Sequence, residues 1–198
     1  MDELTIIICT FNEEKTICDV VKACRLYNER SEIIVVDDGS QDNTEPLLRN
    51  LNKTIRFNYI KLDENRGKSY AMTIGIENAR NDILLFFDAD SIGIRKEHFH
   101  DMFLPVKENK ADMVLGHTAA NFINFKLTPF KAFTGERVLR KKDILPIMDE
   151  IRNIRFGIET YINLYFQTHG KRISYVYLEG LKTLNKYKKT TLLNATRQ

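Results

Sequence analysis

Five consecutive apolar residues run directly into two aspartates in the segment Asp82-Ile-Leu-Leu-Phe-Phe-Asp-Ala-Asp90. A short apolar run without polar alternation is typical of a strand buried on both faces of a sheet. Residues 4–9 and 32–36 carry the same signature. Strands covered on both faces belong to parallel sheets that have helices on each side. The sequence therefore predicts an α/β fold, a Rossmann-like βαβ sandwich with a mostly parallel central sheet.

Helical patterns separate these predicted strands. Residues 13–27 place apolar side chains on one helical stripe, and Pro46 marks the first turn of a second helix. This alternation of strand and helix favours right-handed βαβ units. Helices are predicted at 13–27, 44–51, 68–79, 97–107, 143–151 and 158–168, and further strands at 55–62, 113–116 and 172–178. Residues 118–133 show weak periodicity, which predicts a long loop or a small subdomain.

Length and composition narrow the class of protein. The chain has 198 residues, of which 43% are hydrophobic, and this predicts one globular domain over residues 1–198. No apolar run approaches the roughly 18 residues of a membrane span, so we expect a cytoplasmic protein without an integral anchor. Three cysteines without Cys-x-x-Cys spacing indicate reduced thiols, and the four histidines show no zinc-binding pattern.

The charge is distributed unevenly along the chain. Residues 1–136 carry 17 basic and 22 acidic side chains, whereas residues 137–198 carry 13 and 5. The basic stretch, with a net charge of +8, is predicted to face an anionic partner or to form a solvated basic surface. A phosphorylated substrate and a peripheral contact with the inner face of a membrane both fit such a field. Nucleic acid is not expected, because the basic stretch contains no recognisable recognition module.

Acidic residues follow two of the predicted strands. Asp37 and Asp38 come after the second strand, and Asp88 and Asp90 come after the segment 83–87. The carboxyl ends of parallel strands line the ligand crevice of an open sheet, and acids gathered there need a compensating cation. Mg²⁺ or Mn²⁺ suits such oxygens together with substrate phosphates. The alternative interpretation of Asp37-Asp38-Gly39-Ser40 is a turn that caps a helix.

Four ordered motifs in the first half of the chain resemble those of the family 2 glycosyltransferases, which have the GT-A fold. The motifs are Thr5-Ile-Ile-Ile-Cys-Thr-Phe-Asn-Glu13, Ile33-Ile-Val-Val-Asp-Asp-Gly-Ser40, Asn65-Arg-Gly-Lys68 and Asp82-Ile-Leu-Leu-Phe-Phe-Asp-Ala-Asp90. A looser likeness continues in Phe133-Thr-Gly-Glu-Arg-Val138 and Phe156-Gly-Ile-Glu-Thr-Tyr161. The resemblance implies a transferase that uses a nucleoside diphosphate sugar, with a UDP-sugar favoured and inversion expected. It implies a nucleotide-sugar-binding half at 1–91 and an acceptor-binding half at 92–198.

The resemblance also implies roles for individual residues. Asp90 and Asp88 would hold the metal, and the small Ala89 would leave room for the ligand. The residues expected to bind the donor are Thr10, Asn12, Glu13, Asp37, Asp38, Arg66, Lys68, Asp88 and Ala89. The metal would act as a Lewis acid on the departing diphosphate, so Asp90 is counted with the catalytic residues.

On the acceptor side the chain departs from the family. Glu159-Thr160 stands where many relatives have Glu-Asp, which leaves Glu159 as the candidate base, or as an acid that merely suits the helix dipole. The family's usual histidine metal ligand is missing from Gly180-Leu-Lys-Thr-Leu-Asn-Lys186, so Lys182 or Lys186 could supply positive charge instead. The residues expected to bind the acceptor, a polyprenyl phosphate or a glycan, are Gly135, Arg137, Arg140 and Lys141.

Three other functions compete with this interpretation. A nucleotidylyltransferase should have a glycine-rich phosphate loop after the first strand, and Cys9-Thr-Phe-Asn-Glu13 contains no glycine. A phospho-acceptor receiver domain should place its acidic pair after the first strand and be shorter. A catalytically impaired nucleotide-binding protein of the same fold remains open because the acceptor motif is substituted.

Overall fold

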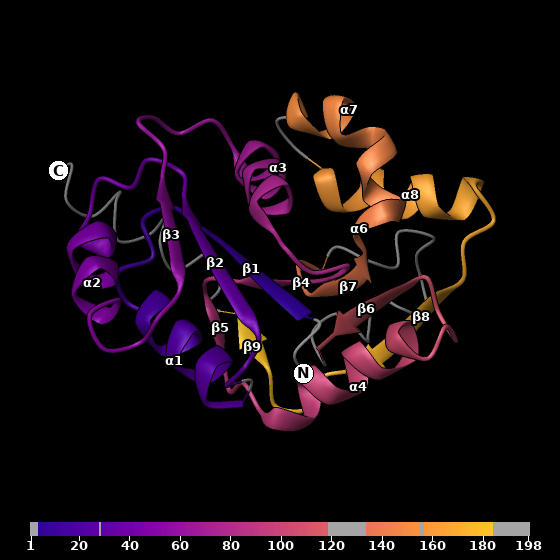
Figure 1. The fold of residues 1–198 in the computed structure, drawn as a ribbon, viewed down its shortest axis with the longest axis horizontal. Coiled ribbons are helices and arrows are strands. Elements are labelled where there is room, and N and C mark those ends of the chain that lie inside the picture. The colour runs from indigo at the N-terminus through magenta and orange to yellow at the C-terminus, as the bar shows by residue number, and fades with distance from the viewer. Residues whose placement is uncertain (1–3, 28, 119–133, 155–156, 184–198) are drawn as a thin grey trace, which may run out of the picture.

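The computed structural model describes residues 4–27, 29–118, 134–154 and 157–183 of the chain. Its elements form a central sheet with helices on both faces (Figure 1). The strands are β1 Leu4–Thr10, β2 Glu32–Asp37, β3 Asn58–Lys61, β4 Ile83–Asp88, β5 Ser91–Ile92, β6 Met113–His117, β7 Arg137–Arg140, β8 Ile173–Tyr177 and β9 Lys182–Thr183. The helices are α1 Ile17–Tyr27, α2 Thr44–Leu51, α3 Lys68–Asn78, α4 Lys96–Lys107, α6 Lys141–Ile144, the 3₁₀ turn η1 Leu145–Ile147, α7 Met148–Arg152 and α8 Ile158–Thr168.

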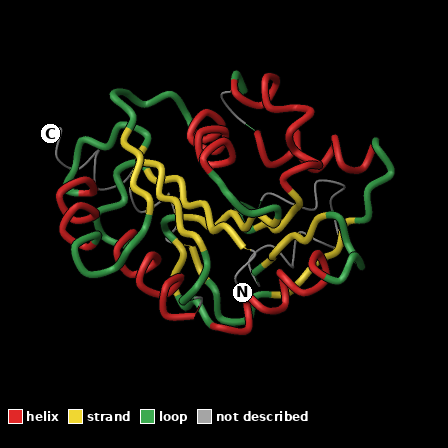
Figure 2. The backbone as a smooth tube through the Cα atoms, in the orientation of Figure 1, coloured by secondary structure: helices red, strands yellow, loops and turns green. Residues whose placement is uncertain are grey.

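Seven strands form the main sheet in the order β3-β2-β1-β4-β7-β6-β8. β1 pairs in parallel with β2 and β4, and β6 pairs in parallel with β8. Among the seven described strands of this sheet, only β7 is antiparallel to its neighbours, and it joins β4 to β6. The predicted α/β fold with a mostly parallel sheet is confirmed. The alternation of strands and helices along the chain is followed in Figure 2.

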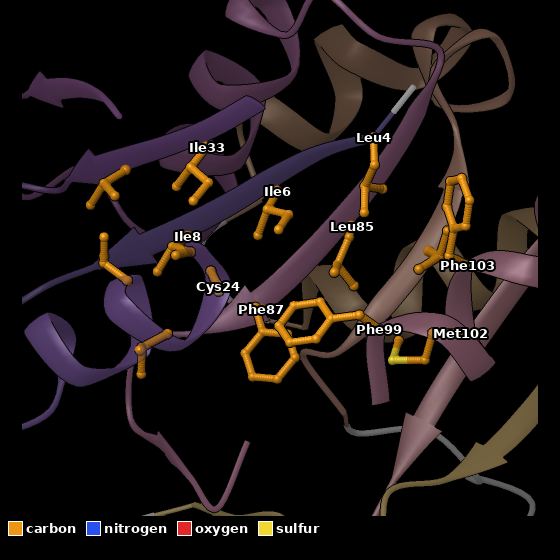
Figure 3. Packing of buried hydrophobic residues seen from close by; sticks show 14 of the residues in the cluster. Leu4, Ile6, Ile8, Cys24, Ile33, Leu85, Phe87, Phe99, Met102 and Phe103 are labelled. Carbon is orange, nitrogen blue, oxygen red and sulfur yellow. The ribbon is translucent and has the colours of Figure 1, made fainter. Parts of the chain in front are cut away.

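Alternate residues of the buried strands pack on opposite faces of the sheet. Ile6 and Ile8 of β1 belong to a core with α1 and α4, whereas Ile7 lies in a second core with α3, α7 and α8. Figure 3 shows the first of these cores, where the rings of Phe87 and Phe99 stack with their centroids 5.5 Å apart. Burial on both faces explains why these strands contain continuous rather than alternating apolar residues.

Three predicted elements differ most from the observed ones, and the first is the helix expected at 13–27, which begins only at Ile17. The strand expected at 55–62 is limited to β3, because this edge strand pairs only with β2, from Ile34 with Asn58 to Asp37 with Lys61. The helix expected at 143–151 is divided into α6, η1 and α7. Pro146 lies in η1, where it lacks an N–H group and disfavours helical geometry in the residue before it.

The strand β7 was missed by the sequence analysis. It consists of Arg-Val-Leu-Arg, and its two central residues are fully buried between β4 and β6. Four residues with charged ends give no periodic signal, because the pairing partners that stabilise this strand lie far away in the sequence. The predicted loop at 118–133 falls almost entirely outside the described residues.

Two further expectations concern thiols and membranes. Cys9, Cys18 and Cys24 form no disulfide. Among the helices of the described ranges, none has the length and apolar character needed to cross a bilayer.

Candidate active site

The carboxyl ends of β1, β2 and β4 meet at one edge of the sheet, which we call the carboxyl edge. Thr10 is in register with Asp37, and Cys9 is in register with Asp88. The predicted convergence of two acidic motifs is therefore present in the fold. The residues that follow these strands form the loops of a candidate site.

Asp38 organises the loop before α3. Its Oδ1 accepts a hydrogen bond from the backbone N–H of Arg66 and its Oδ2 from that of Gly67, each at 2.8 Å. Gly39, with φ of 75°, packs directly on the Glu64–Asn65 backbone. Burial raises the pKa of Asp38, although the two backbone donors oppose this effect. Asp38 thus fixes the start of the helix that carries Lys68.

Asp37 is completely buried, and its carboxylate oxygens are used in hydrogen bonds within the protein. Its Oδ1 accepts a hydrogen bond from the backbone N–H of Ser40, and its Oδ2 accepts one from the hydroxyl of Tyr59, both at 2.8 Å. The side chain of Lys61 lies 3.6 Å from the same Oδ2. Asp37 was predicted to bind the donor, but its carboxylate is completely covered, so a direct contact with the nucleoside does not fit this environment.

The loop after β1 interlocks with the loop after β2. The N–H of Asn12 donates to Ser40 Oγ at 2.9 Å, and Asn12 Oδ1 accepts from the N–H of Gln41 at 2.8 Å. The N–H of Glu13 donates to Thr44 Oγ1 at 3.0 Å. Asn12 and Glu13, both predicted to bind the donor, therefore fix the loop after β1 against the loop after β2.

Two further residues complete the end of β1. Thr10 Oγ1 is buried and has no hydrogen-bond partner within the described part of the chain. Phe11 is 41% exposed, although it follows a strand that is buried at every position except the partly buried Cys9. Sequence reasoning did not single out Phe11, and its apolar side chain in an otherwise polar loop was the available signal.

Lys68 joins the two halves of the chain at the carboxyl edge. Its Nζ lies 2.8 Å from Asp88 Oδ1 and 2.7 Å from Glu159 Oε1. Burial alone would raise the pKa of Glu159, but the charge and hydrogen bond of Lys68 hold it below its ordinary value. Similarly, burial opposes the charged form of Lys68, and the two carboxylates outweigh it and raise the pKa of Lys68. The structure therefore places the predicted base in an ion pair with a predicted donor-binding residue.

The turn before β7 covers one side of Asp88. A Cβ atom on Gly135 would overlap both carboxylate oxygens of Asp88, so any other residue here would force the Asp88 side chain to move. The neighbouring Glu136 is buried, and its two oxygens accept hydrogen bonds from Ser91 Oγ at 2.8 Å and Thr134 Oγ1 at 2.7 Å. Burial, followed by the charge of Asp88, raises the pKa of Glu136. Sequence reasoning missed Glu136, which links β5 to the turn before β7.

Arg137 is fully buried behind this turn rather than exposed to an acceptor. Its Nη2 donates to the carbonyl of Thr134 at 2.7 Å, and its Nη1 donates to Asn163 Oδ1 at 3.3 Å. Within the described ranges its Nε has no hydrogen-bond partner. The expected direct contact with the acceptor does not fit this burial, because β7 carries the side chain into the interior between the sheet and α8.

Arg140 and Lys141 lie at the opposite edge of the sheet, which we call the amino edge. Arg140 is in register with Ile83 at the start of β4, and its Nη2 donates to Asn109 Oδ1 at 2.7 Å. Lys141 Nζ donates to the carbonyl of Ala79 at 2.7 Å. The antiparallel direction of β7 separates these residues from Gly135, so their predicted acceptor role is not supported.

The candidate metal ligands lie at the end of β4. Asp88 has 25% of its side chain exposed, and Asp90 is half-buried in the following turn, beyond the buried Ala89. No group of three or more His, Cys, Asp or Glu side chains suited to a metal occurs in the described ranges. A divalent ion held by Asp88 and Asp90 would therefore need further oxygens from a bound substrate or from water. Lys182 is exposed on β9, and Lys186 lies outside the described residues.

Comparisons of sequence agree on one family. The sequence model described as "Glycosyl transferase family 2" matches residues 5–174. The poly-β-1,6-N-acetyl-D-glucosamine synthase of Staphylococcus aureus strain COL is 37% identical over 93 residues, which are 46% of this chain and 23% of that protein. The protein of the same name from Staphylococcus epidermidis is 30% identical over 93 residues, with the same coverage. The matched part thus spans about a quarter of these curated relatives.

Solved structures show the same fold. Glucosyl-3-phosphoglycerate synthase from Mycobacterium tuberculosis, in complex with phosphoglyceric acid, superposes with a TM-score of 0.75 at 18% identity, over 96% of this chain and 75% of that one. The same synthase has been crystallised with Mn²⁺, UDP and glucosyl-3-phosphoglycerate. TarS of Staphylococcus aureus gives a TM-score of 0.70 at 17% identity, over 98% of this chain and 39% of TarS.

Proposed function

The chain belongs to glycosyl transferase family 2, and from this premise we propose that it transfers a sugar from a UDP-sugar to a hydroxyl group of a glycan-type acceptor. The observation that carries this proposal is the arrangement of Asp88 and Glu159 around one ammonium group, at 2.8 and 2.7 Å. This ammonium group connects Asp88, which lies on the donor side of the site, with Glu159, which is the candidate base. In this proposal, residues 1–91 form the donor-binding side of the site and residues 92–198 form the acceptor-binding side.

On the donor side, the interlocked loops after β1 and β2 would hold the nucleoside. Phe11 offers an exposed aromatic face on which a base can stack. Asp38 holds the Arg66–Gly67 backbone, which fixes the segment that carries both Arg66 and Lys68. The guanidinium of Arg66 already lies over the ring of Tyr70, 3.8 Å from its centroid, which orients that charge.

Asp88 and Asp90 are the residues that would hold Mg²⁺ or Mn²⁺ together with the diphosphate. Two carboxylates on one turn fit an ion that keeps part of its coordination for phosphate oxygens and water. Such an ion, when bound, neutralises the charge that builds on the departing diphosphate. Ser91, which follows Asp90 and begins β5, donates from its Oγ to the buried Glu136 and so fixes the end of this turn. A structural neighbour crystallised with Mn²⁺ and UDP is consistent with this cofactor.

Glu159 is the base that this proposal assigns to the acceptor. The hydroxyl oxygen forms a bond to the anomeric carbon as the bond from that carbon to the diphosphate oxygen breaks. The hydroxyl proton passes to Glu159, the electron pair leaves with UDP, and the configuration inverts. A phosphate acceptor needs no base and would favour fixed cations, but Arg140 and Lys141 bind Asn109 and Ala79 at the other edge. A hydroxyl acceptor therefore fits the site better than a polyprenyl phosphate.

The test compares donors and acceptors in one assay. UDP release is measured with UDP-glucose and UDP-N-acetylglucosamine, with either oligosaccharides or a polyprenyl phosphate as acceptor, and with Mg²⁺ or Mn²⁺ present or chelated. We expect metal-dependent UDP release that an oligosaccharide stimulates. Release stimulated only by the polyprenyl phosphate would overturn the hydroxyl assignment. UDP binding without release would identify an impaired nucleotide-binding protein, and pyrophosphate release from a nucleoside triphosphate and a sugar phosphate would identify a nucleotidylyltransferase.

A further inference from the structure

Lys68 occupies the position between the donor carboxylate and the candidate base. We infer that Lys68 is an exchangeable cation, which neutralises Asp88 and Glu159 before the donor binds and moves to the donor diphosphate afterwards, so that Glu159 becomes free to act as the base. This inference rests on the proposed function. It adds a coupling between the two substrates, because the base is released only when the donor is in place.

The contacts around Lys68 allow its side chain, but not its backbone, to move. Asp38 holds the N–H groups of Arg66 and Gly67 just before it, and the hydroxyl of Ser69 donates to the carbonyl of Ile154 just after it. The Lys68 side chain itself is 39% exposed. A lysine ammonium on a flexible four-carbon stem can change partners by rotation of side-chain bonds alone. The exchange therefore needs no rearrangement of α3.

The neighbouring cation cannot perform the same exchange. Arg137 is fully buried, and its guanidinium is fixed to Thr134 and Asn163. Lys68 is also the first residue of α3, where the helix dipole is unfavourable for a positive charge. Its position is thus maintained by the two carboxylates, and a diphosphate with several charges can compete with them.

The present contacts also make Glu159 a poor base. Its Oε1 accepts a hydrogen bond from Lys68 at 2.7 Å, which occupies one lone pair of that oxygen, and the positive charge beside it makes the carboxylate a weaker proton acceptor. Only 20% of the Glu159 side chain is exposed, which limits the approach of an acceptor to the other oxygen. Removal of Lys68 from this position therefore precedes proton transfer.

The exchange makes an unusual prediction for UDP binding. If Glu159 and the diphosphate compete for Lys68, Glu159→Gln should bind UDP about three- to tenfold more tightly than the wild type, because the competitor has lost its charge. Lys68→Met should bind UDP at least about tenfold more weakly. In the double variant, Glu159→Gln should give no gain, since the two changes act through one ion pair.

Calorimetry with UDP, at constant Mg²⁺, measures these affinities for the four proteins. Glu97→Gln is the matched control, because Glu97 is exposed on α4, which packs on the other face of the sheet from α3, and its UDP affinity should equal that of the wild type. Thermal unfolding of each variant checks that it is folded. A wild type that binds UDP while Glu159→Gln shows equal or weaker affinity would overturn the exchange alone. Absence of UDP binding by the wild type would overturn the proposed donor, and the exchange with it.

Discussion

The two ends of β7 carry arginines with opposite surroundings. Arg137 begins the strand, is fully buried, and holds the Thr134 carbonyl near Asp88. Arg140 ends the strand, is half-buried, and donates to Asn109 at the amino edge. Three residue steps along the strand place their Cα atoms about 10 Å apart. Two arginines in one short motif therefore serve different edges of the sheet, and proximity in the sequence does not place a charge in the site.

The charged groups at these two edges differ in what they bind. The carboxyl-edge cluster consists of Lys68, Asp88, Glu136, Arg137 and Glu159. The amino-edge cluster consists of Asn109, Asp112, Arg140, Lys141 and Arg172. In the first, the Lys68 ammonium pairs with Asp88 and Glu159, Glu136 accepts from a buried hydroxyl, and Arg137 donates to the Thr134 carbonyl. In the second, Lys141 and Arg172 donate to the main-chain carbonyls of Ala79 and Asn109, and the ion pair of Arg172 with Asp112 lies at the surface, with the arginine side chain 55% exposed. The first arrangement suits chemistry, and the second secures loops.

The largest expected effect tests whether the carboxyl-edge cluster is catalytic. Glu159→Gln should lower the rate of sugar transfer about 10²- to 10⁴-fold, the usual contribution of a general base, without loss of folding. Steady-state kinetics with UDP release measure this effect. Glu150→Gln, an exposed change on α7, should leave the rate unchanged. Equal rates for Glu159→Gln and the wild type would show that the carboxyl-edge cluster does not supply the base.

Arg137→Met tests whether this arginine holds the fold rather than a substrate. It removes a buried cation near Glu136, Glu159 and Asp88, and it leaves the Thr134 carbonyl and Asn163 without their donor. We expect a loss of about 3 to 5 kcal/mol in the free energy of unfolding, measured by urea denaturation. If the variant retains wild-type stability but binds the acceptor poorly, Arg137 contacts the acceptor after all.

Asp38→Asn tests how much the charge of Asp38, as distinct from its size, contributes to holding the loop before α3. The amide keeps one acceptor oxygen, so one of the N–H groups of Arg66 and Gly67 loses its partner, at a cost of about 1 to 3 kcal/mol in stability. Because the folded pKa of Asp38 is raised, wild-type stability from this group is greatest below the ordinary carboxyl pKa and falls as pH rises through the folded pKa. The variant should lack this decline. A pH series of urea denaturation shows whether the difference between the two proteins narrows as predicted.

The smallest effect concerns the amino edge. Hydrogen bonds from Arg172 hold the pKa of Asp112 below its ordinary value, and the arginine side chain is 55% exposed. Asp112→Asn should therefore cost only about 0.5 to 1 kcal/mol of stability at neutral pH and leave sugar transfer unchanged. The folded pKa is depressed, so the stabilisation is complete above the ordinary carboxyl pKa and disappears as pH falls through the folded pKa. A change in transfer rate would contradict the assignment of this edge to structure.

The sequence by itself determined the sheet and one side of the site. Continuous apolar segments such as 83–87 can be satisfied only by burial on both faces, and this implies a parallel sheet covered by helices. Parallel strands bring their carboxyl ends to one edge, so Asp37, Asp38 and Asp88 could be grouped without coordinates. The resemblance to family 2 glycosyltransferases rested on the same motifs, and the family was confirmed over residues 5–174.

Only the tertiary structure decided which charges face one another. The Lys68–Glu159 contact joins residues 91 positions apart, and β7 owes its direction to pairing with β4 and β6. That direction buried Arg137, carried Arg140 and Lys141 away, and placed Gly135 on Asp88. The physical reason is that local patterns report the burial of an element, whereas ion pairs and antiparallel insertions depend on distant partners that a short segment of sequence does not encode.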